Sequence, residues 1–251
     1  MSGHSKWSTI KHKKAALDAK RGKAWGKLSR NVTVAARHGG SDPSANPRLR
    51  LAVEKAKAAN MPKDTIEKAV KKGTGELEGE TYEEIVYEGY GPLGVAIMCN
   101  VVTDNRHRTA PEVKKLFERG GGNLGSPNCV AWMFLQKGVF VINTAQVSED
   151  RVMEVALENG ADDVTSSEMV HEVTCPPDRF HDLKAAFEAA GIPIQGGDVT
   201  MVASNQITLD LENARKVVKL MEALEEHDDV NSVSSNFDIP DDVLAKLAAE
   251  A

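Results

Sequence analysis

Apolar residues recur at every third or fourth position between residues 15 and 73, which is the spacing of helices that bury one face. Gly39-Gly40 interrupts the pattern, and Asn46 followed by Pro47 is a favourable start for the next helix. The predicted helices span residues 15–37, 47–60 and 62–73. Helices this short are marginal alone in water, so we expect them to pack together as a small bundle.

The hydrophobic period changes after the glycine-rich stretch at residues 73–79, where an alternation typical of strands begins. The elements predicted next are strands at 82–90 and 93–102, a helix at 105–119, a loop at 120–127 and a strand at 130–135. A second series follows, with a strand at 138–143, a helix at 148–159, strands at 162–167 and 169–175, a helix at 177–190 and a strand at 192–202. The βαββαβ order of this series is typical of a ferredoxin-like fold.

The last part of the chain predicts a helix at 211–226, a strand at 230–237 and a short helix from Pro240. The sheet of residues 81–135 lacks one helix–strand unit, and residues 206–237 supply one. We therefore expect an α+β, multidomain protein with an N-terminal three-helix bundle and two α/β domains, at least one of them ferredoxin-like. The expected domains are a basic helical head with an N-terminal tail at 1–75, a discontinuous α/β domain at 80–136 plus 205–240, and an inserted ferredoxin-like domain at 137–204.

Charge is distributed very unevenly along the chain. Residues 1–75, which we call the head, hold 18 lysine and arginine residues against 5 aspartate and glutamate residues, whereas residues 76–251 hold 13 against 32. A basic segment attracts polyanions by counterion release, and an acidic body repels them. Two explanations stay open: the head binds nucleic acid, or it docks onto the acidic body of its own chain.

The head offers the side chains that contact with nucleic acid requires. Lysines act as point charges on phosphates, arginines bind them with paired donors, and Trp7 offers a face on which a base can stack. Trp25 lies on the apolar stripe of its helix and is better explained as a core residue. The candidate nucleic-acid-binding residues are Lys6, Trp7, Lys11, His12, Lys13, Lys14, Lys20, Arg21, Lys23, Lys27, Arg48 and Arg50.

A second candidate is the turn that precedes the helix at 105–119, where Asn105, Arg106 and Arg108 form a possible anion-binding site. Arginines in a first helical turn are electrostatically unfavourable, because the helix N-terminus is already positive. A bound phosphate or RNA backbone would offset that cost. The alternative is an internal pair, such as Arg108 with Glu112.

The chain shows no motif for catalysis or for metal binding. Gly120, Gly122 and Gly125 match the dinucleotide-binding pattern, but a strand rather than a helix follows them, so a nucleotide site is not supported. The three cysteines lie far apart, and the histidines have no partner at ligand spacing. We therefore expect no enzymatic activity, no cofactor and no metal.

No stretch of the sequence approaches the ~18 consecutive apolar residues of a membrane span, and the first residues contain no apolar export segment. We therefore expect a cytoplasmic protein without a membrane partner.

Several motifs resemble the YebC/PmpR family over residues 2 to about 240. They are Gly3-His4-Ser5-Lys6-Trp7, Asn46-Pro47-Arg48-Leu49-Arg50, Tyr87-Glu88-Gly89-Tyr90-Gly91-Pro92 and Thr103-Asp104-Asn105-Arg106. The resemblance implies a helical head and two α/β domains around a cleft, in a cytoplasmic protein described as a probable transcriptional regulator that binds DNA. Relatives in mitochondria are translational activators of cytochrome c oxidase, and bacterial members have been connected with the ribosome.

The function that we expect is a non-enzymatic, nucleic-acid-binding regulator of gene expression that acts on DNA. The alternative is a translation factor that associates with the ribosome through ribosomal RNA or tRNA. Two further classes are an interaction protein whose acidic domains bind a basic partner, and an enzyme with an unrecognised site in the cleft between domains.

Overall fold

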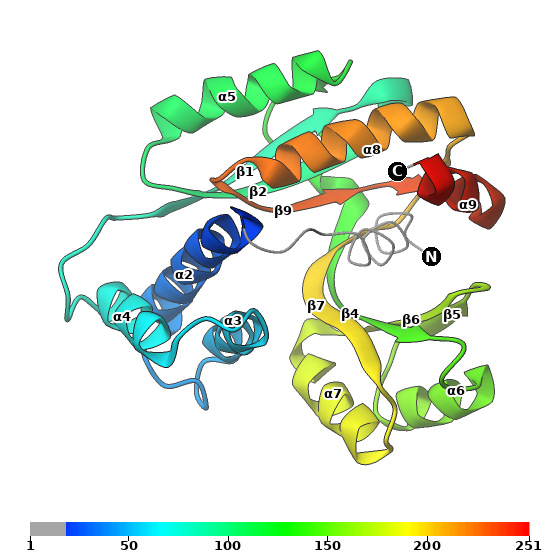
Figure 1. Cartoon of the computed structure of the whole chain (residues 1–251), viewed down its shortest axis with the longest axis horizontal. Helices are drawn as coiled ribbons and strands as arrows, with labels where there is room; N and C mark the ends of the chain where they lie inside the picture. The colour runs from blue at the N-terminus through cyan, green and yellow to red at the C-terminus, as the bar shows by residue number, and fades with distance from the viewer. Residues whose placement is uncertain (1–18, 251) are drawn as a thin grey trace.

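The computed structural model describes residues 19–250, which form a helical head and two sheet domains (Figure 1). The predicted α+β fold class is confirmed. The head contains α2 (Ala19–Gly39), α3 (Pro47–Ala58) and α4 (Lys63–Thr74). The predicted start of the first helix, at residue 15, lies outside the described residues.

The head is held together by its own small core and by one polar side chain. The buried apolar residues of this core include Val32, Leu49 and Ile66. Asn46 caps α3, because its Oδ1 accepts a hydrogen bond from the Leu49 amide at 3.0 Å, while its Nδ2 donates to the Ala35 carbonyl at 2.9 Å. The residue that marks the start of this helix in the sequence therefore also links α3 to α2.

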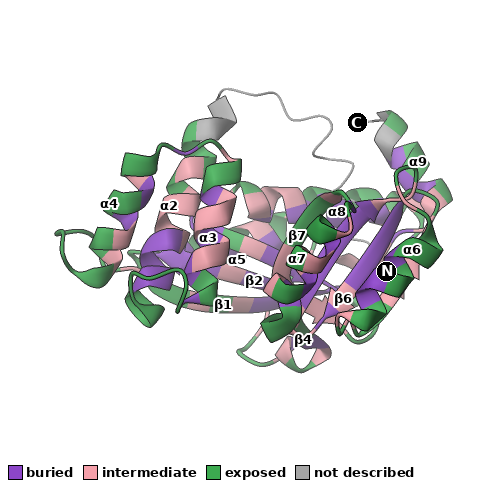
Figure 2. Cartoon of the chain, turned by 90° about the horizontal axis from the view of Figure 1, so that it is seen from below, coloured by how far each residue is buried: buried purple, intermediate pink, exposed green. Residues whose placement is uncertain are grey.

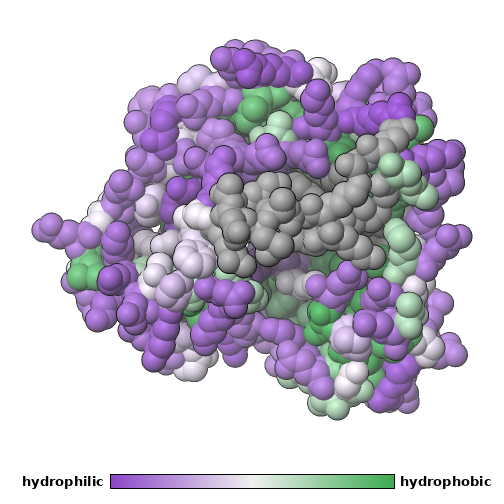
Figure 3. All heavy atoms as spheres, viewed as in Figure 1, coloured by the Kyte–Doolittle hydropathy of each residue, from purple (hydrophilic) through white to green (hydrophobic). Residues whose placement is uncertain are grey.

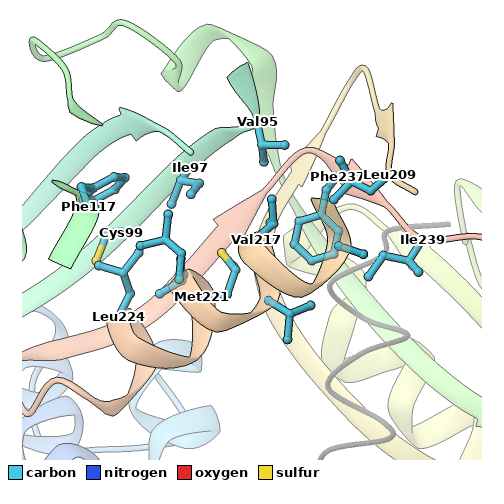
Figure 4. Packing of buried hydrophobic residues seen from close by; sticks show 14 of the residues in the cluster. Val95, Ile97, Cys99, Phe117, Leu209, Val217, Met221, Leu224, Phe237 and Ile239 are labelled. Carbon is cyan, nitrogen blue, oxygen red and sulfur yellow. The ribbon is translucent and has the colours of Figure 1, made fainter. Parts of the chain in front are cut away.

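The first sheet takes strands from two distant parts of the chain. It contains β1 (Glu83–Tyr90), β2 (Ala96–Thr103), β3 (Asn123–Leu124) and β9 (Val230–Ser235), in the antiparallel order β3-β1-β2-β9. The helices α5 (Arg106–Arg119) and α8 (Leu211–Glu226) cover one face, and α9 (Asp241–Glu250) packs beside α8. Figure 4 shows Phe117, Ile97, Met221 and Leu224 meeting between this sheet and its helices.

The second sheet domain has the predicted ferredoxin-like topology. Its elements are β4 (Phe134–Asn143), α6 (Glu149–Glu158), β5 (Asp163–Ser166), β6 (Val170–Cys175), α7 (Phe180–Ala189) and β7 (Ile194–Ala203). The antiparallel order is β5-β6-β4-β7. The rings of Phe140 and Phe180 stack at 4.6 Å in its core. Figure 2 shows that buried residues line β4 and β6, whereas exposed residues cover the outer sides of the helices.

The prediction of two separate strands at 130–135 and 138–143 is wrong. A short 3-10 turn at Ala131–Met133 leads into the single strand β4, which pairs with β7 from Phe134 opposite Ala203 to Ile142 opposite Ile194. Gly138 does not break the strand. A Cβ at this position would lie 2.6 Å from the Cys175 sulfur, so glycine is required there for close packing.

The end of the β4–β7 ribbon nearest the first sheet joins the two sheet domains. Phe134 packs with Ala96 and Met98, on the face of the first sheet opposite α5 and α8. The strand order supports the proposed division into 80–136 plus 205–240 around 137–204, although residue 137 lies inside β4. These domain boundaries remain a prediction.

The short elements complete the chain between these units. They are 3-10 turns at Pro92–Gly94 and Pro177–Arg179, and a parallel pair formed by β8 (Ile207–Thr208) and β10 (Phe237–Asp238). The strand predicted at 230–237 is therefore divided between β9 and β10, and the helix predicted from residue 177 begins with a 3-10 turn.

A buried carboxylate organises the glycine-rich loop that follows α5. Glu88 is only 6% exposed, and its carboxylate accepts three backbone hydrogen bonds, from the amides of Asn128 at 2.7 Å, Val130 at 2.8 Å and Ala131 at 2.7 Å. Such an arrangement satisfies a buried charge with donors that have no other partner. The side chain therefore fixes this loop to the C-terminal half of β1.

Candidate nucleic-acid interface

Three cations of α2 contact the turn between α8 and β9. Lys23 Nζ donates to the Glu226 carbonyl at 2.8 Å and lies 3.0 Å from Asp228 Oδ1. Lys27 Nζ donates to the Glu225 carbonyl at 2.5 Å, and Arg30 donates to the Asp228 carbonyl. The carbonyls at a helix C-terminus lack partners within the helix and carry partial negative charge, so they attract cations. Lys23 and Lys27, both predicted to bind nucleic acid, therefore have partners within the chain.

The charged form of Lys27 is disfavoured at this contact. Burial, together with the nearby charge of Lys23, lowers the pKa of Lys27 to about 8. Arg30 lowers it further, while the carboxylates of Asp228 and Glu225 oppose the shift. At this contact, the nearby carboxylates therefore offset only part of the repulsion and burial that act on Lys27.

The cations of α3 connect the head with both sheets. Arg48 Nη1 donates to Glu84 Oε2 on β1 at 3.1 Å, and His38 also lies 3.3 Å from this carboxylate. Lys55 pairs with Asp198 on β7. Arg50 is half-buried, and its Nε has no hydrogen-bond partner in the structure. The second explanation of the charge split, docking of the head onto its own acidic body, therefore accounts for part of the basic residues.

Another set of head lysines is exposed and makes no ion pair within residues 19–250. It consists of Lys57 on α3 and Lys68, Lys71 and Lys72 on α4. The three α4 lysines share one helix face, because their spacing is three and four residues. Figure 3 shows hydrophilic residues over most of the visible surface of the head. The family motifs do not include these lysines, and only their helical spacing could have indicated them.

The remaining candidates in the head are located as follows. Lys6, Trp7, Lys11, His12, Lys13 and Lys14 lie outside the described residues. Lys20 and Arg21 belong to the first turn of α2, and their side chains are not described. Trp25 packs against the core of the head, as predicted, and its Nε1 donates to the Ala59 carbonyl at 2.9 Å.

In the second candidate site, the turn before α5, carboxylates of the same chain already pair with Arg108. Arg108 Nη2 lies 2.9 Å from Asp229 Oδ2 and 2.8 Å from Asp104 Oδ1. Asp229 is buried and also accepts a hydrogen bond from the Thr109 hydroxyl at 2.7 Å. These contacts favour the internal-pair alternative for Arg108, although the partner is not Glu112, which lies 3.0 Å from His227.

Two other residues of this turn have different roles. Asn105 caps α5, because its Oδ1 accepts hydrogen bonds from the amides of His107 and Arg108, each at 3.1 Å. Arg106 is exposed and makes no ion pair with the described residues. Anion binding therefore stays a prediction for Arg106 alone.

The Arg108 guanidinium lowers the pKa values of two carboxyl groups, those of Asp104 and Asp229. A hydrogen bond from Arg108 lowers the pKa of Asp104 below its usual value. Burial raises the pKa of Asp229, but hydrogen bonds from Arg108 and Thr109 lower it more, so the net shift is also downward. Both carboxylates therefore stabilise the folded protein in their charged form.

The substitution Arg108→Gln is expected to make the protein less resistant to acid. Because both folded-state pKa values are lowered, the stability they provide is present above about pH 4 and is lost as the pH falls through the lowered values. Without the guanidinium both pKa values rise, so this stability is already missing at neutral pH and less acid is needed to unfold the variant. Circular dichroism followed during acid titration should show the unfolding midpoint moving upward.

The matched control is Arg151→Gln, which removes an exposed arginine whose Nη1 lies 2.6 Å from Glu154 Oε2. This variant should leave the acid midpoint unchanged, since exposed pairs contribute little. An equal shift in both variants would contradict the assigned role of Arg108.

The glycines that match a dinucleotide-binding pattern serve packing. A Cβ at Gly122 would lie 2.3 Å from the Tyr90 carbonyl oxygen, and one at Gly120 would lie 2.6 Å from Leu220.

Cys99 is fully buried, and burial raises the pKa of its thiol to about 12, so it is a poor nucleophile.

Across residues 19–250, no group of three or more histidine, cysteine, aspartate or glutamate side chains is placed to hold a metal ion. Nor does that part of the chain contain a helix of the length and apolar character that crossing a membrane requires.

A cavity of about 630 Å³ lies where the head meets the two sheets. Arg48 and Lys55 line it from the head, Val86 and Asn100 from the first sheet, and Thr200 and His181 from the second domain. It corresponds to the cleft that the family resemblance implied. Its cations are paired with the acidic residues Glu84 and Asp198, which also line it.

Comparison with known proteins agrees with this architecture. A probable transcriptional regulatory protein of Geobacter sulfurreducens is 53% identical over 247 residues, which cover 98% of this chain and 100% of the relative. One of Desulforapulum autotrophicum is 54% identical over 243 residues, covering 97% and 98%. The crystal structure of a conserved hypothetical protein from Aquifex aeolicus is similar with a TM-score of 0.82 at 49% identity, covering 92% of this chain and 96% of that one.

Both parts of the chain also match domains of one family. Residues 5–76 match the TACO1/YebC protein N-terminal domain, and residues 82–237 match the TACO1/YebC second and third domain. The resemblance found in the sequence motifs is confirmed, and the chain belongs to the TACO1/YebC family.

Proposed function

We propose that this protein is a non-enzymatic regulator of gene expression that binds DNA through the basic residues of its head. The observation that carries the proposal is the exposed α4 face with Lys68, Lys71 and Lys72, which makes no ion pair within the described part of the chain. The names of the relatives, probable transcriptional regulatory proteins, support DNA as the target.

Binding would depend on contacts with phosphates rather than with bases. Lysine is a point charge without the fixed paired donors that read a guanine edge, and α4 contains no arginine, asparagine or glutamine. Such contacts position a protein on nucleic acid but do not select a sequence. We therefore expect a steep dependence of affinity on salt and a weak preference for sequence.

The same observation favours a second candidate, a translation factor that binds ribosomal RNA or tRNA. A lysine face without base-reading side chains recognises backbone shape, which is how proteins recognise double-stranded RNA. The acidic residues that dominate positions 76–251 would repel either polyanion, so contact would be confined to the head in both cases.

Crosslinking in cells followed by sequencing of the bound nucleic acid tests the proposal. Enrichment of promoter DNA would support a transcriptional regulator, and enrichment of ribosomal RNA or tRNA would replace it with the second candidate. Purified protein should lose roughly 10³-fold or more in affinity between 50 and 200 mM salt if it contacts six or more phosphates. The absence of any bound nucleic acid, in cells and in the salt titration, would contradict both candidates.

A further inference from the structure

The contact between α2 and the α8–β9 turn, which we call the head clamp, is made of polar groups. Lys23, Lys27 and Arg30 supply the cations. Asn31 Nδ2 donates to Asn231 Oδ1 at 2.5 Å beside them. The acceptors are the last two carbonyls of α8, the Asp228 carbonyl and the Asp228 carboxylate, whose side chain is 62% exposed. Arg30 also lies 4.0 Å from the buried carboxylate of Asp229. Exposed ion pairs of this kind are each worth about 0–1 kcal/mol and weaken with salt.

No hydrophobic cluster of described residues joins the head to the first sheet. The core of the head is built from residues of α2, α3 and α4, with Met61 between helices, and the core of the first sheet contains no residue of the head. The cavity of about 630 Å³ lies between them. Apolar burial, which is the main stabilising term in most domain contacts, therefore contributes little to the contact between the head and the first sheet.

The contact between the head and the second domain is also made mainly of charged groups. It includes the pairs Lys55–Asp198 and Lys184–Glu54, with Leu51 at the edge of the second core. Gly75, with φ of 82°, and Gly79 lie in the segment that connects the head to β1. Docking of the head thus depends mainly on charged and polar contacts, and a polyanion can replace those in which the head supplies the cation.

We propose that the α8–β9 turn acts as an internal substitute for nucleic acid, so that the turn and nucleic acid compete for Lys23, Lys27 and Arg30. This inference rests on the proposed function and adds its regulation. In the docked head the α4 lysines are exposed and make the first contact. Displacement of the turn then adds the cations of α2 to the nucleic-acid interface.

The electrostatics of the clamp favour such an exchange. Helix carbonyls carry only partial charges, about half an elementary charge in total, whereas each phosphate carries a full negative charge. Lys23, Lys27 and Arg30 repel one another in the docked state, and this repulsion and burial lower the pKa of Lys27 to about 8. Exposure on a phosphate backbone would relieve both penalties on the charge of Lys27.

The test compares charge reversal inside the head clamp with charge reversal far from it, in the full chain. Asp228→Lys replaces the clamp carboxylate by a like charge facing Lys23, and Asp228→Asn removes only the carboxylate charge. Glu158→Lys is the control: it makes the same charge change at the end of α6, at an exposed side chain that makes no ion pair with the described residues. Binding of a short fluorescein-labelled duplex DNA, and of an RNA hairpin, is measured by anisotropy.

Competition predicts that Asp228→Lys binds about three- to tenfold more tightly than Glu158→Lys, with Asp228→Asn in between. Small-angle scattering of Asp228→Lys should also show a larger radius of gyration, because the head is released. Equal affinities for the two lysine variants, with binding intact, would overturn the inference and leave the proposed function standing. The absence of binding by all variants and by the unmodified chain would overturn both.

Discussion

Replacing Lys68, Lys71 and Lys72 together by glutamine is expected to weaken nucleic-acid binding roughly tenfold or more near physiological salt, because each lysine that binds a phosphate releases counterions. The slope of log affinity against log salt should fall in magnitude by about one for each phosphate that the variant no longer neutralises. All three side chains are exposed, so the weaker binding would come from the interface and not from the core. A salt titration of binding in variant and unmodified protein measures both quantities.

The control makes the same change of charge on the body of the protein. Lys115 and Arg119 on α5 and Lys219 on α8 are exposed and make no ion pair with described residues. Their triple glutamine variant should retain most of the affinity. Lys71 and Lys72 also lie in the last turn of α4, where cations stabilise the helix by a few tenths of a kcal/mol. Helicity is therefore checked first, and an equal decrease of affinity in both triple variants would show that α4 is not the interface.

Most of the fold could be predicted because the period of the hydrophobic pattern is a local property. The helices of the head and the βαββαβ series follow from this period alone. The error at β4 has a physical cause: Gly138 resembles a strand end in the sequence, but its missing Cβ leaves room for Cys175 and Phe180. The need for glycine at this position is visible only once β4 is paired with β6 and α7 is packed against them.

The site was less predictable because its contacts join residues far apart in the chain. Lys23 and Asp228 are separated by about two hundred positions, and no local pattern shows that they meet. The sequence left open whether the basic head docks on its own body or binds nucleic acid. In the structure the described α2 cations, Arg48 and Lys55 are docked and the α4 lysines are exposed, and nucleic-acid binding by the exposed lysines is our proposal.

Glu88→Ala is expected to lower the free energy of unfolding by about 2–4 kcal/mol. The substitution leaves the amides of Asn128, Val130 and Ala131 without their acceptor. The buried Val130 amide costs about 1–3 kcal/mol when unsatisfied, and the two part-buried amides cost less because water can reach them. A decrease of this size is a large fraction of the 5–15 kcal/mol that typically stabilises a domain. Urea unfolding, followed by far-ultraviolet circular dichroism, measures the change.

Two further variants separate the hydrogen bonds of Glu88 from the strand that carries it. Glu88→Gln keeps one acceptor oxygen and should cost less than Glu88→Ala, because an amide cannot accept all three bonds as strongly as a carboxylate. Glu83→Ala changes an exposed glutamate on the same strand and should alter stability by no more than about 0.5 kcal/mol. If Glu88→Ala were as stable as Glu83→Ala, the loop would not depend on the buried carboxylate. The glycine contacts with Tyr90 and Leu220, and the hydrogen bond from the Tyr90 hydroxyl to the Cys129 carbonyl, would then be sufficient to hold it.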